Sequence, residues 1–345
     1  MRFSIGYAAP LTGPQSIVGV PMLRVVEMAA SDLSRDGLEL GVVAVDDEAE
    51  DRLAPRVARE LVNNSSVLAV VGHKNSGPSG AAAPVYAAAG LAQLSQCATD
   101  NALTRSGWRT FFRLCADNEH QAAAAAEYAA AHLAPRAAFA IHDRTSYGQP
   151  LVEAFAKRLE ALTATKVLTL SLSVGQEDFS EIVERVRDAR ADLVYIGATE
   201  IEGSKLMTAL RRGGSEAQLV TSEGGPQNPL AGLAGAAAEG SIHTYAGEDP
   251  TATEPTRRLI ERCEREFGSA PSFAVETYEA VMVIADALAG GASTRDGVLE
   301  AIAHADVEGF AGRIRFDASG DRAGAPVSLW RVSGGLMLPV ALQPS

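Results

Sequence analysis

Small hydroxyl side chains follow two predicted strands in the N-terminal part of the chain, at the point where each strand ends. Ser76 comes shortly after the apolar strand 68–71, and Thr99 follows the strand 91–95. Ligands of open parallel sheets bind just beyond the carboxyl ends of the strands. Ser76 also stands where the next helix is expected to begin, so its hydroxyl, the unpaired backbone N–H groups and the helix dipole together favour a bound carboxylate. The alternative is that Ser76 only caps that helix.

The common enzyme motifs are absent from the sequence. Residues 72–77 have the glycine spacing of a phosphate-binding loop, but Pro78 and Ser79 stand where lysine and a hydroxyl residue are required. No G-x-G-x-x-G follows the first predicted strand, and neither G-x-S-x-G nor H-E-x-x-H occurs. His142 and Asp143 end a predicted strand, where such a pair is more often local capping than half of a catalytic dyad. We therefore expect a protein that is not an enzyme and that needs no cofactor.

The charge and the cysteine content argue against a nucleic-acid-binding protein and a metal-binding protein. The 345 residues include 30 basic and 43 acidic ones, a net charge of −13, which disfavours a nucleic-acid partner because such binding needs Lys and Arg to neutralise phosphates. Cys97, Cys115 and Cys263 lie far apart, without C-x-x-C spacing or a nearby histidine, so a metal site is not expected. We expect the three thiols to be small buried hydrophobic groups, with at most one disulfide.

The apolar stretches do not predict a membrane span. The longest ones, 80–94 and 121–133, are shorter than the roughly 18–20 residues that a span requires, and polar groups interrupt them. Residues 1–7 run directly into a predicted strand, without the apolar core and cleavage site of a signal peptide. Two explanations remain open: a signal peptide has been removed, or the protein stays in the cytoplasm.

Short apolar or β-branched runs alternate with amphipathic stretches, a pattern typical of βα units wound around parallel sheets. A first set has predicted strands at 4–9, 40–46, 68–71, 91–95 and 110–113, with helices at 18–36, 51–64 and 77–89. A second set has predicted helices at 119–133, 147–162, 178–187 and 202–212, with strands at 137–142, 166–171, 193–197 and 218–221.

The pattern changes in the last third of the chain. Three helices are predicted at 253–267, 272–289 and 294–303, followed by strands at 312–316, 327–332 and 336–340. Because these helices do not extend the second sheet, we expect them to return and cover the first. The sequence thus predicts an α/β protein with two lobes, made of residues 1–117 with 248–325 and of residues 118–247 with 326–345.

The segment from Val70 to Thr104 resembles the branched-chain amino-acid-binding proteins of ABC importers. It reads V-V-G-H-K-N-S-G, then P-V-Y-A-A-A-G-L, then L-S-Q-C-A-T-D-N-A-L-T. The resemblance runs from the first strand to about Tyr278 and includes, in order, the motifs at 11–14, 141–143, 147–148, 177–179, 194–197 and 222–224. It implies the type I periplasmic-binding fold: two Rossmann-like lobes with parallel-type sheets flanked by helices, three crossovers, and a ligand between the lobes.

The resemblance also implies a set of ligand-binding residues. Ser76 and Thr99 match the hydroxyl residues that bind the α-carboxylate of an amino acid. Cys97 matches the position whose backbone carbonyl accepts a hydrogen bond from the ammonium group, and Glu223 matches the acidic partner of that ammonium. This agrees with the chemistry of a zwitterion, which needs donors at one end and acceptors at the other.

Four further positions are implied to surround the side chain of the ligand. Tyr147 and Phe273 match aromatic walls of the pocket. Val18 and Thr199 stand where close relatives often have aromatic residues, so we expect room for a bulkier side chain, unless neighbouring residues such as Ile17 or Ile201 fill the space.

The leading hypothesis is an extracytoplasmic receptor, periplasmic, extracellular or lipid-anchored, that closes on a hydrophobic L-amino acid and delivers it to the permease subunits of an ABC importer. The alternative is a cytoplasmic or receptor-type sensor of the same fold that binds an amide or an aromatic acid and signals to a partner protein. An enzyme of this fold is a third possibility with only fold-level support.

Overall fold

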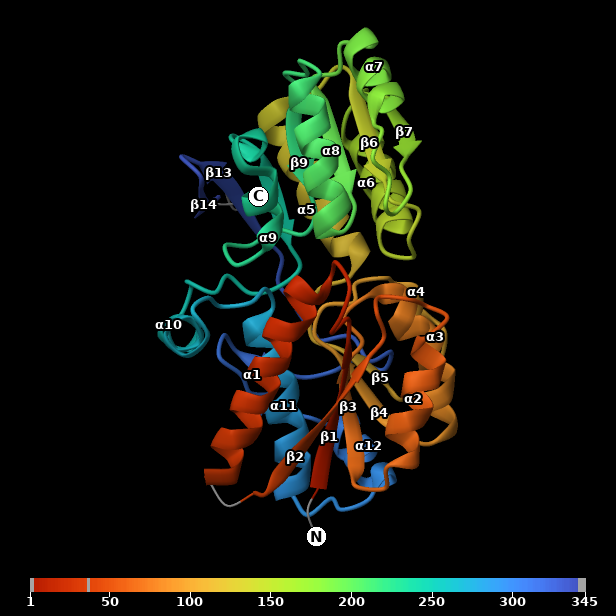
Figure 1. The fold of residues 1–345 in the computed structure, drawn as a ribbon, viewed down its shortest axis with the longest axis vertical. Helices are drawn as coiled ribbons and strands as arrows, with labels where there is room; N and C mark the ends of the chain where they lie inside the picture. The colour runs from red at the N-terminus through yellow and green to blue at the C-terminus, as the bar shows by residue number, and fades with distance from the viewer. Residues whose placement is uncertain (1–2, 36–37, 341–345) are drawn as a thin grey trace. The chain divides into compact units, whose positions relative to one another are not determined.

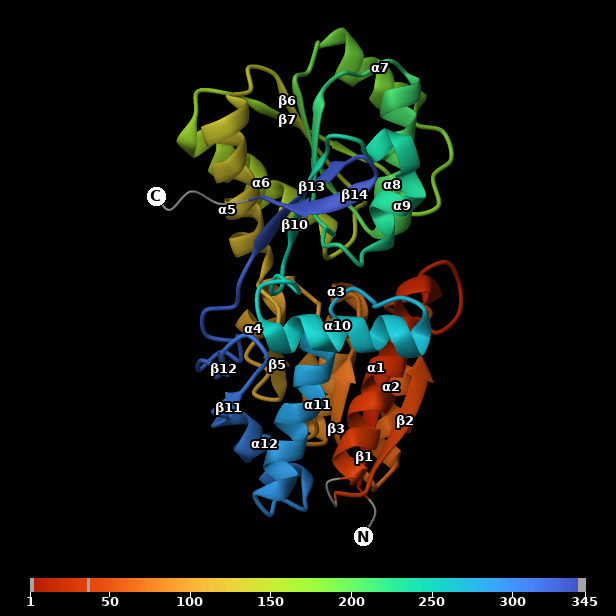
Figure 2. The same cartoon turned by 90° about the vertical axis from the view of Figure 1, so that its left-hand side faces the viewer.

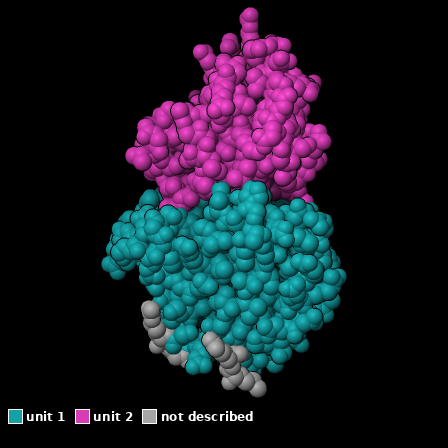
Figure 3. Space-filling model, viewed as in Figure 1, with its two compact units in different colours: residues 1–116, 247–326 teal, residues 117–246, 327–345 magenta. Residues whose placement is uncertain are grey.

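The chain forms two compact units, which Figure 3 shows in different colours. The computed structural model describes residues 3–35 and 38–340. Unit 1 comprises Met1–Ala116 and Gly247–Pro326, and unit 2 comprises Asp117–Ala246 and Val327–Ser345. The chain therefore passes from one unit to the other three times.

Unit 1 contains a five-stranded parallel sheet with the strand order β2-β1-β3-β4-β5. Its strands are β1 (Phe3–Ala9), β2 (Leu40–Asp46), β3 (Val67–Gly72), β4 (Ala92–Ser95) and β5 (Phe111–Arg113). Every residue of β3 is buried, which explains its continuous apolar sequence, because a central parallel strand is covered on both faces.

Helices cover both faces of this sheet (Figure 1). One face carries α2 (Ala54–Asn63) and α3 (Ser76–Ala88). The other carries α1 (Ser16–Arg35), α11 (Ala274–Ala289) and α12 (Arg295–Ala303), and α11 packs against α1. Two of the three helices predicted to cover the first sheet, α11 and α12, thus do so, whereas the third, α10 (Glu254–Phe267), packs on α11 and α1. The short elements of unit 1 are α4 (Ala102–Arg105), β11 (Val307–Glu308) and β12 (Arg313–Ile314).

Unit 2 contains a seven-stranded sheet with the order β14-β13-β10-β9-β8-β6-β7. Five strands are parallel: β6 (Ala138–His142), β7 (Val167–Ser171), β8 (Leu193–Gly197), β9 (Gln218–Thr221) and β10 (Ile242–Tyr245). The C-terminal hairpin of β13 (Ser328–Ser333) and β14 (Leu336–Pro339) adds to β10 in antiparallel fashion (Figure 2).

Alternating side chains of β8 build the two cores of unit 2. Leu193 and Tyr195 pack on the face covered by α5 (Asn118–Tyr128) and α6 (Gly148–Leu162). Val194 and Ile196 pack on the face covered by α7 (Ser180–Asp188), α8 (Glu200–Arg212) and α9 (Pro229–Ala234). A π-helical turn, Ala129–Leu133, extends α5, and a 3-10 turn, Gly235–Ala238, follows α9.

Several predicted elements differ from those in the structure. No strand was predicted at β10, which lies between β9 and β13. The strand was not predicted because it contains the polar residues His243 and Thr244, which interrupt the apolar pattern. Both are buried, and the His243 imidazole bonds to the Ser241 hydroxyl at 2.7 Å. The predicted strand 312–316 is only the two-residue β12, and the predicted helix 18–36 begins earlier, at Ser16, while its predicted end at Asp36 lies outside the described residues.

The three cysteines are buried and free, as expected for small hydrophobic residues. Within residues 3–35 and 38–340, no helix has the length and apolar character needed to cross a membrane.

Candidate functional site

The loops after β3 and β4 bring Ser76, Cys97 and Thr99 together at the carboxyl edge of the sheet in unit 1. The Ser76 hydroxyl accepts a hydrogen bond from the Asp100 backbone N–H at 3.3 Å. The Cys97 thiol donates to the Lys74 carbonyl oxygen at 3.3 Å. The two loops that carry the predicted carboxylate-binding residues are therefore joined directly.

Ser76 is the first residue of α3, and the N-cap position belongs to Asn75. Capping alone therefore does not account for Ser76. At the next position, a Cβ atom on Gly77 would lie 2.1 Å from the Asp51 carboxylate, so a larger residue there would require the Asp51 side chain to move. The N-terminus of α3 thus presents backbone N–H groups beside the Ser76 hydroxyl, an arrangement that favours an anion.

Thr99 is buried, and its hydroxyl makes no hydrogen bond of ordinary geometry within the described part of the chain. Such a group costs roughly 1–3 kcal/mol when it stays unsatisfied, so it is a strong candidate to bond a ligand. The backbone on both sides of Thr99 is fixed by Arg113 of β5, whose guanidinium donates to the carbonyl oxygens of Ala98 (3.3 Å) and Asp100 (2.8 Å). The Arg113 guanidinium is itself paired with Asp321. Sequence reasoning missed Arg113, because only the fold places it under a loop that is distant in sequence.

Val18 lies on α1 of unit 1, and Phe273 directly precedes α11, the helix that packs against α1. Val18 is buried and lies in the first turn of α1. Phe273 is the N-cap residue of α11 and has a φ of 55°. A positive φ in a bulky residue is strained, and such strain is concentrated at binding and active sites.

In unit 2, Tyr147 and Glu223 lie close to each other. Tyr147 precedes the first residue of α6 and is buried. Burial raises the pKa of the Tyr147 phenol well above its usual value, and the negative charge of Glu223 raises it further. Glu223 follows β9 with a φ of 54°, so it shares with Phe273 the left-handed backbone that side chains rarely adopt. The structure thus brings the predicted acidic group and one predicted aromatic wall together within one unit.

Thr199 is the N-cap residue of α8, and its hydroxyl donates to the Glu202 carboxylate at 2.8 Å. Its backbone N–H donates to Asp143 at 3.0 Å, and Asp143 also accepts from the backbone N–H and the hydroxyl of Thr145. The bonds to Thr145 are the local capping expected for Asp143, and the bond to Thr199 joins the loops after β6 and β8. His142 accepts at Nδ1 from the Arg144 backbone N–H, and burial lowers its pKa.

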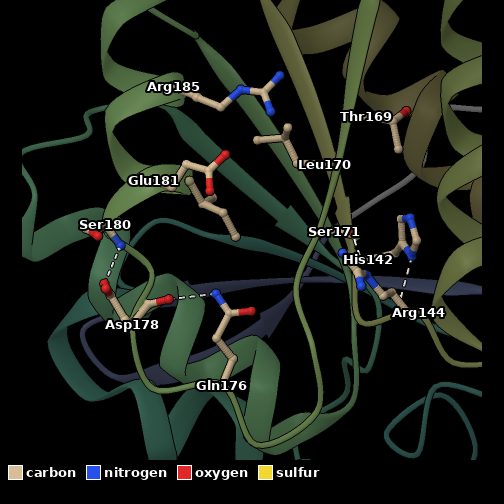
Figure 4. Close-up of a pocket in the computed structure, with 11 residues that line it drawn as sticks. His142, Arg144, Thr169, Leu170, Ser171, Gln176, Asp178, Ser180, Glu181 and Arg185 are labelled. Atoms are coloured by element: carbon tan, nitrogen blue, oxygen red, sulfur yellow. Dashed lines mark hydrogen bonds between the residues drawn. The ribbon is translucent and has the colours of Figure 1, made fainter.

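A separate pocket of about 500 Å³ lies in unit 2 between β7 and α7 (Figure 4). Arg185 and Glu181 of α7 line one side of it, and His142 and Arg144 line the other. None of the predicted ligand-binding residues lines this pocket. Its walls carry charges of both signs, which favours no single class of ligand.

Comparison with known proteins identifies the family. The sequence model described as periplasmic binding protein matches residues 3–335. A Leu/Ile/Val-binding protein homolog from Brucella abortus is 30% identical over 338 residues, covering 95% of this chain and 90% of that protein.

Two solved structures have the same fold. A leucine-binding protein from Thermotoga maritima has a TM-score of 0.90 at 24% identity, with 98% of each chain covered. A solute-binding protein of an ABC transporter from R. palustris, in complex with benzoate, has a TM-score of 0.87 at 17% identity, covering 99% of this chain and 96% of that one. The predicted fold class and resemblance are confirmed: this chain belongs to the periplasmic binding protein family and has the type I fold of the branched-chain amino-acid-binding proteins.

Proposed function

We propose that the protein is a receptor that binds a hydrophobic L-amino acid and does not transform it. The observation that carries the proposal is the pair of joined loops in unit 1, where the Ser76 hydroxyl, the N-terminus of α3 and the unsatisfied Thr99 hydroxyl lie together. This set of donors suits a carboxylate. Charge-assisted hydrogen bonds of this kind contribute about 1.5–3 kcal/mol each.

The other end of the ligand is assigned to acceptors. In the proposal, the backbone carbonyl of Cys97 and the carboxylate of Glu223 accept from the ammonium group. Tyr147, Phe273, Val18 and Thr199 surround the side chain. Because these residues come from both units, the two units act as lobes that close on one ligand by a hinge motion at the three crossings of the chain.

The cellular role follows from the relatives. The Brucella abortus protein is named for Leu/Ile/Val binding, and the R. palustris structure is described as part of an ABC transporter. We therefore propose that this protein works outside the cytoplasmic membrane and presents its closed form to the permease subunits of an ABC importer.

A calorimetric titration tests the proposal. The amino acid that binds best among Val, Leu, Met and Phe is compared with its carboxamide and with its N-acetyl derivative. Loss of either charge leaves desolvated protein groups without a partner, so both derivatives are expected to bind at least tenfold more weakly. Equal affinity for all three compounds would refute the assignment of a zwitterion.

An aromatic acid is the second candidate ligand, because the similar R. palustris protein was solved with benzoate. Such a ligand has the carboxylate that Ser76 and Thr99 suit but no cation for Glu223. The two candidates are therefore separated by Glu223→Gln, which weakens the binding of an amino acid but leaves the binding of benzoate unchanged.

A further inference from the structure

Among the buried polar atoms of unit 2 that make no hydrogen bond of ordinary geometry within the described residues, four form a group on one side of the sheet. They are the side-chain oxygens of Asn118, Gln121, Tyr147 and Tyr195. All four residues lie around α5, α6 and the neighbouring strands, on one face of the sheet. Buried groups of this kind are rare in native proteins, and a cluster of them requires a reason beyond packing.

Gln121 of α5 is connected to the loop that carries Glu223. Its side-chain Nε2 donates to the Thr244 carbonyl oxygen at 3.2 Å, and the Gly224 backbone N–H donates to the same oxygen at 2.9 Å. One carbonyl of β10 therefore holds both the side chain of Gln121 and the residue directly after Glu223. The elements α5 and β10 lie against each other (Figure 2).

The backbone at Glu223 needs this external support. Its φ of 54° is unfavourable for a residue with a side chain, and such a conformation persists only where the surrounding structure holds it. Gly224 is pressed against β10 so closely that a Cβ atom there would lie 2.4 Å from the Cβ atom of His243. A change in the position of the Thr244 carbonyl would therefore move Glu223.

Asn118 makes the corresponding link to Tyr147. Its side-chain Nδ2 donates to the Tyr147 carbonyl oxygen at 3.1 Å. Asn118 and Gln121 are three residues apart in the first turns of α5, so they lie on one face of that helix. The helix begins directly after Asp117, which caps it by accepting from the His120 backbone N–H at 2.8 Å.

We propose that Gln121 is a positioning residue for ligand binding, which sets the place and orientation of the Glu223 carboxylate through the Thr244 carbonyl and Gly224. Gln121 does not contact the ligand in this proposal. The inference rests on the proposed function, because it assigns to Glu223 the recognition of an ammonium group.

The test uses Gln121→Met, which keeps the length of the side chain but removes the Nε2 donor. L-leucine and 4-methylpentanoate, which is leucine without its amino group, are titrated into the wild-type protein and the variant. We expect the affinity for L-leucine to fall roughly tenfold while that for 4-methylpentanoate stays within about twofold. Gln149→Met is the matched control, since Gln149 is exposed on α6 of the same unit and its side-chain Nε2 donates to the Glu153 carboxylate at 2.9 Å.

A second measurement needs no ligand. The titration of the Glu223 carboxyl is followed by ¹³C NMR in the unliganded protein, with the signal assigned by its disappearance in Glu223→Gln. We expect its midpoint to differ between the wild-type protein and Gln121→Met and to be unchanged in Gln149→Met.

Each outcome decides one of the two proposals. An equal loss of affinity for both ligands, or an unchanged Glu223 titration, would overturn the positioning role and leave Gln121 a structural residue. If the wild-type protein does not prefer L-leucine over 4-methylpentanoate, the proposed recognition of the ammonium group by Glu223 fails, and a shifted Glu223 titration in Gln121→Met then shows only that Gln121 sets the surroundings of Glu223.

Discussion

Replacing the buried carboxyl of Glu276 by an amide should change how the stability of unit 1 depends on pH. Glu276 lies on α11 with 1% of its surface exposed, and its Oε1 accepts from the Glu248 backbone N–H at 2.9 Å. Its neighbour Glu279 is also buried and bonds to Arg322 at 2.8 Å. Burial is the main cause that raises the pKa of Glu276 from 4.5 to about 7, and the charge of Glu279 adds to it.

The magnitude follows from the linkage between proton binding and folding. Between pH 4.5 and about 7 the folded chain keeps a proton on Glu276 that the unfolded chain has lost. The free energy of unfolding therefore falls as the pH rises through this window. A pKa difference of about 2.5 corresponds to a loss on the order of 3 kcal/mol, complete once the pH exceeds the folded-state value.

Glu276→Gln removes this titration and retains an oxygen that accepts from Glu248. As the pH rises from about 5 to 8, we expect the variant to lose less stability than the wild-type protein, by up to about 3 kcal/mol. The buried amide N–H₂ brings a cost of its own, about 1–3 kcal/mol if unsatisfied, which is independent of pH. The slope of stability with pH is therefore the diagnostic quantity, rather than the stability at one pH.

Urea unfolding across this range, followed by tryptophan fluorescence, measures the slope. The two tryptophans of the chain are Trp108 in unit 1 and Trp330 in unit 2, so a Trp330→Phe background reports on unit 1. Glu264→Gln, at an exposed position on α10, is the matched control and should keep the wild-type slope. If Glu276→Gln also keeps the wild-type slope, Glu276 does not titrate in this window and the reasoning is wrong.

Three further predictions concern the ligand. Thr99→Ala and Glu223→Gln should each weaken amino-acid binding roughly tenfold, as measured by calorimetry, and should change the melting temperature of the unliganded protein little. A loss of stability with unchanged affinity would show that these residues are structural. Saturating ligand should reduce the radius of gyration measured by small-angle scattering, because a ligand shifts a hinge equilibrium towards the state that it binds better, and identical radii would argue against closure. Leu, Met or Phe should bind better than Val, and Thr199→Tyr should reverse that order, because the tyrosine ring fills the room beside the side chain of the ligand. If Val binds best and the substitution has no effect, the pocket is not enlarged.

The local sequence was enough to predict most elements of the fold. The alternation of apolar runs and amphipathic helices identified the parallel strands β1, β3, β8 and β9, because buried parallel strands need continuous apolar residues. It also identified β2, an edge strand that is only partly buried. It failed at β10, where Ser241, His243 and Thr244 interrupt the apolar pattern. Their polar groups are buried there, and the bond between Ser241 and His243 satisfies two of them, a pairing that no local pattern reveals.

In the candidate site, too, some residues could be predicted from the local sequence and others could not. Ser76 and Thr99 could be selected from the sequence because short hydroxyl residues after strands are a local signal. Arg113 could not, since it holds the backbone on both sides of Thr99 from a different strand. Sequence reasoning also had no means of showing that Glu223 and Phe273 have positive φ values, because these depend on the packing of their neighbours.

The sequence by itself determined the α/β class and the positions of most helices and strands, since each of these leaves a local pattern of apolar and polar residues. Only the tertiary structure decided what surrounds each polar group. Burial and the charge of Glu279 raise the pKa of Glu276, and one carbonyl of β10 connects Gln121 to the loop of Glu223. These properties arise from desolvation and from hydrogen bonds between residues far apart in the chain, which the sequence specifies only through the complete fold.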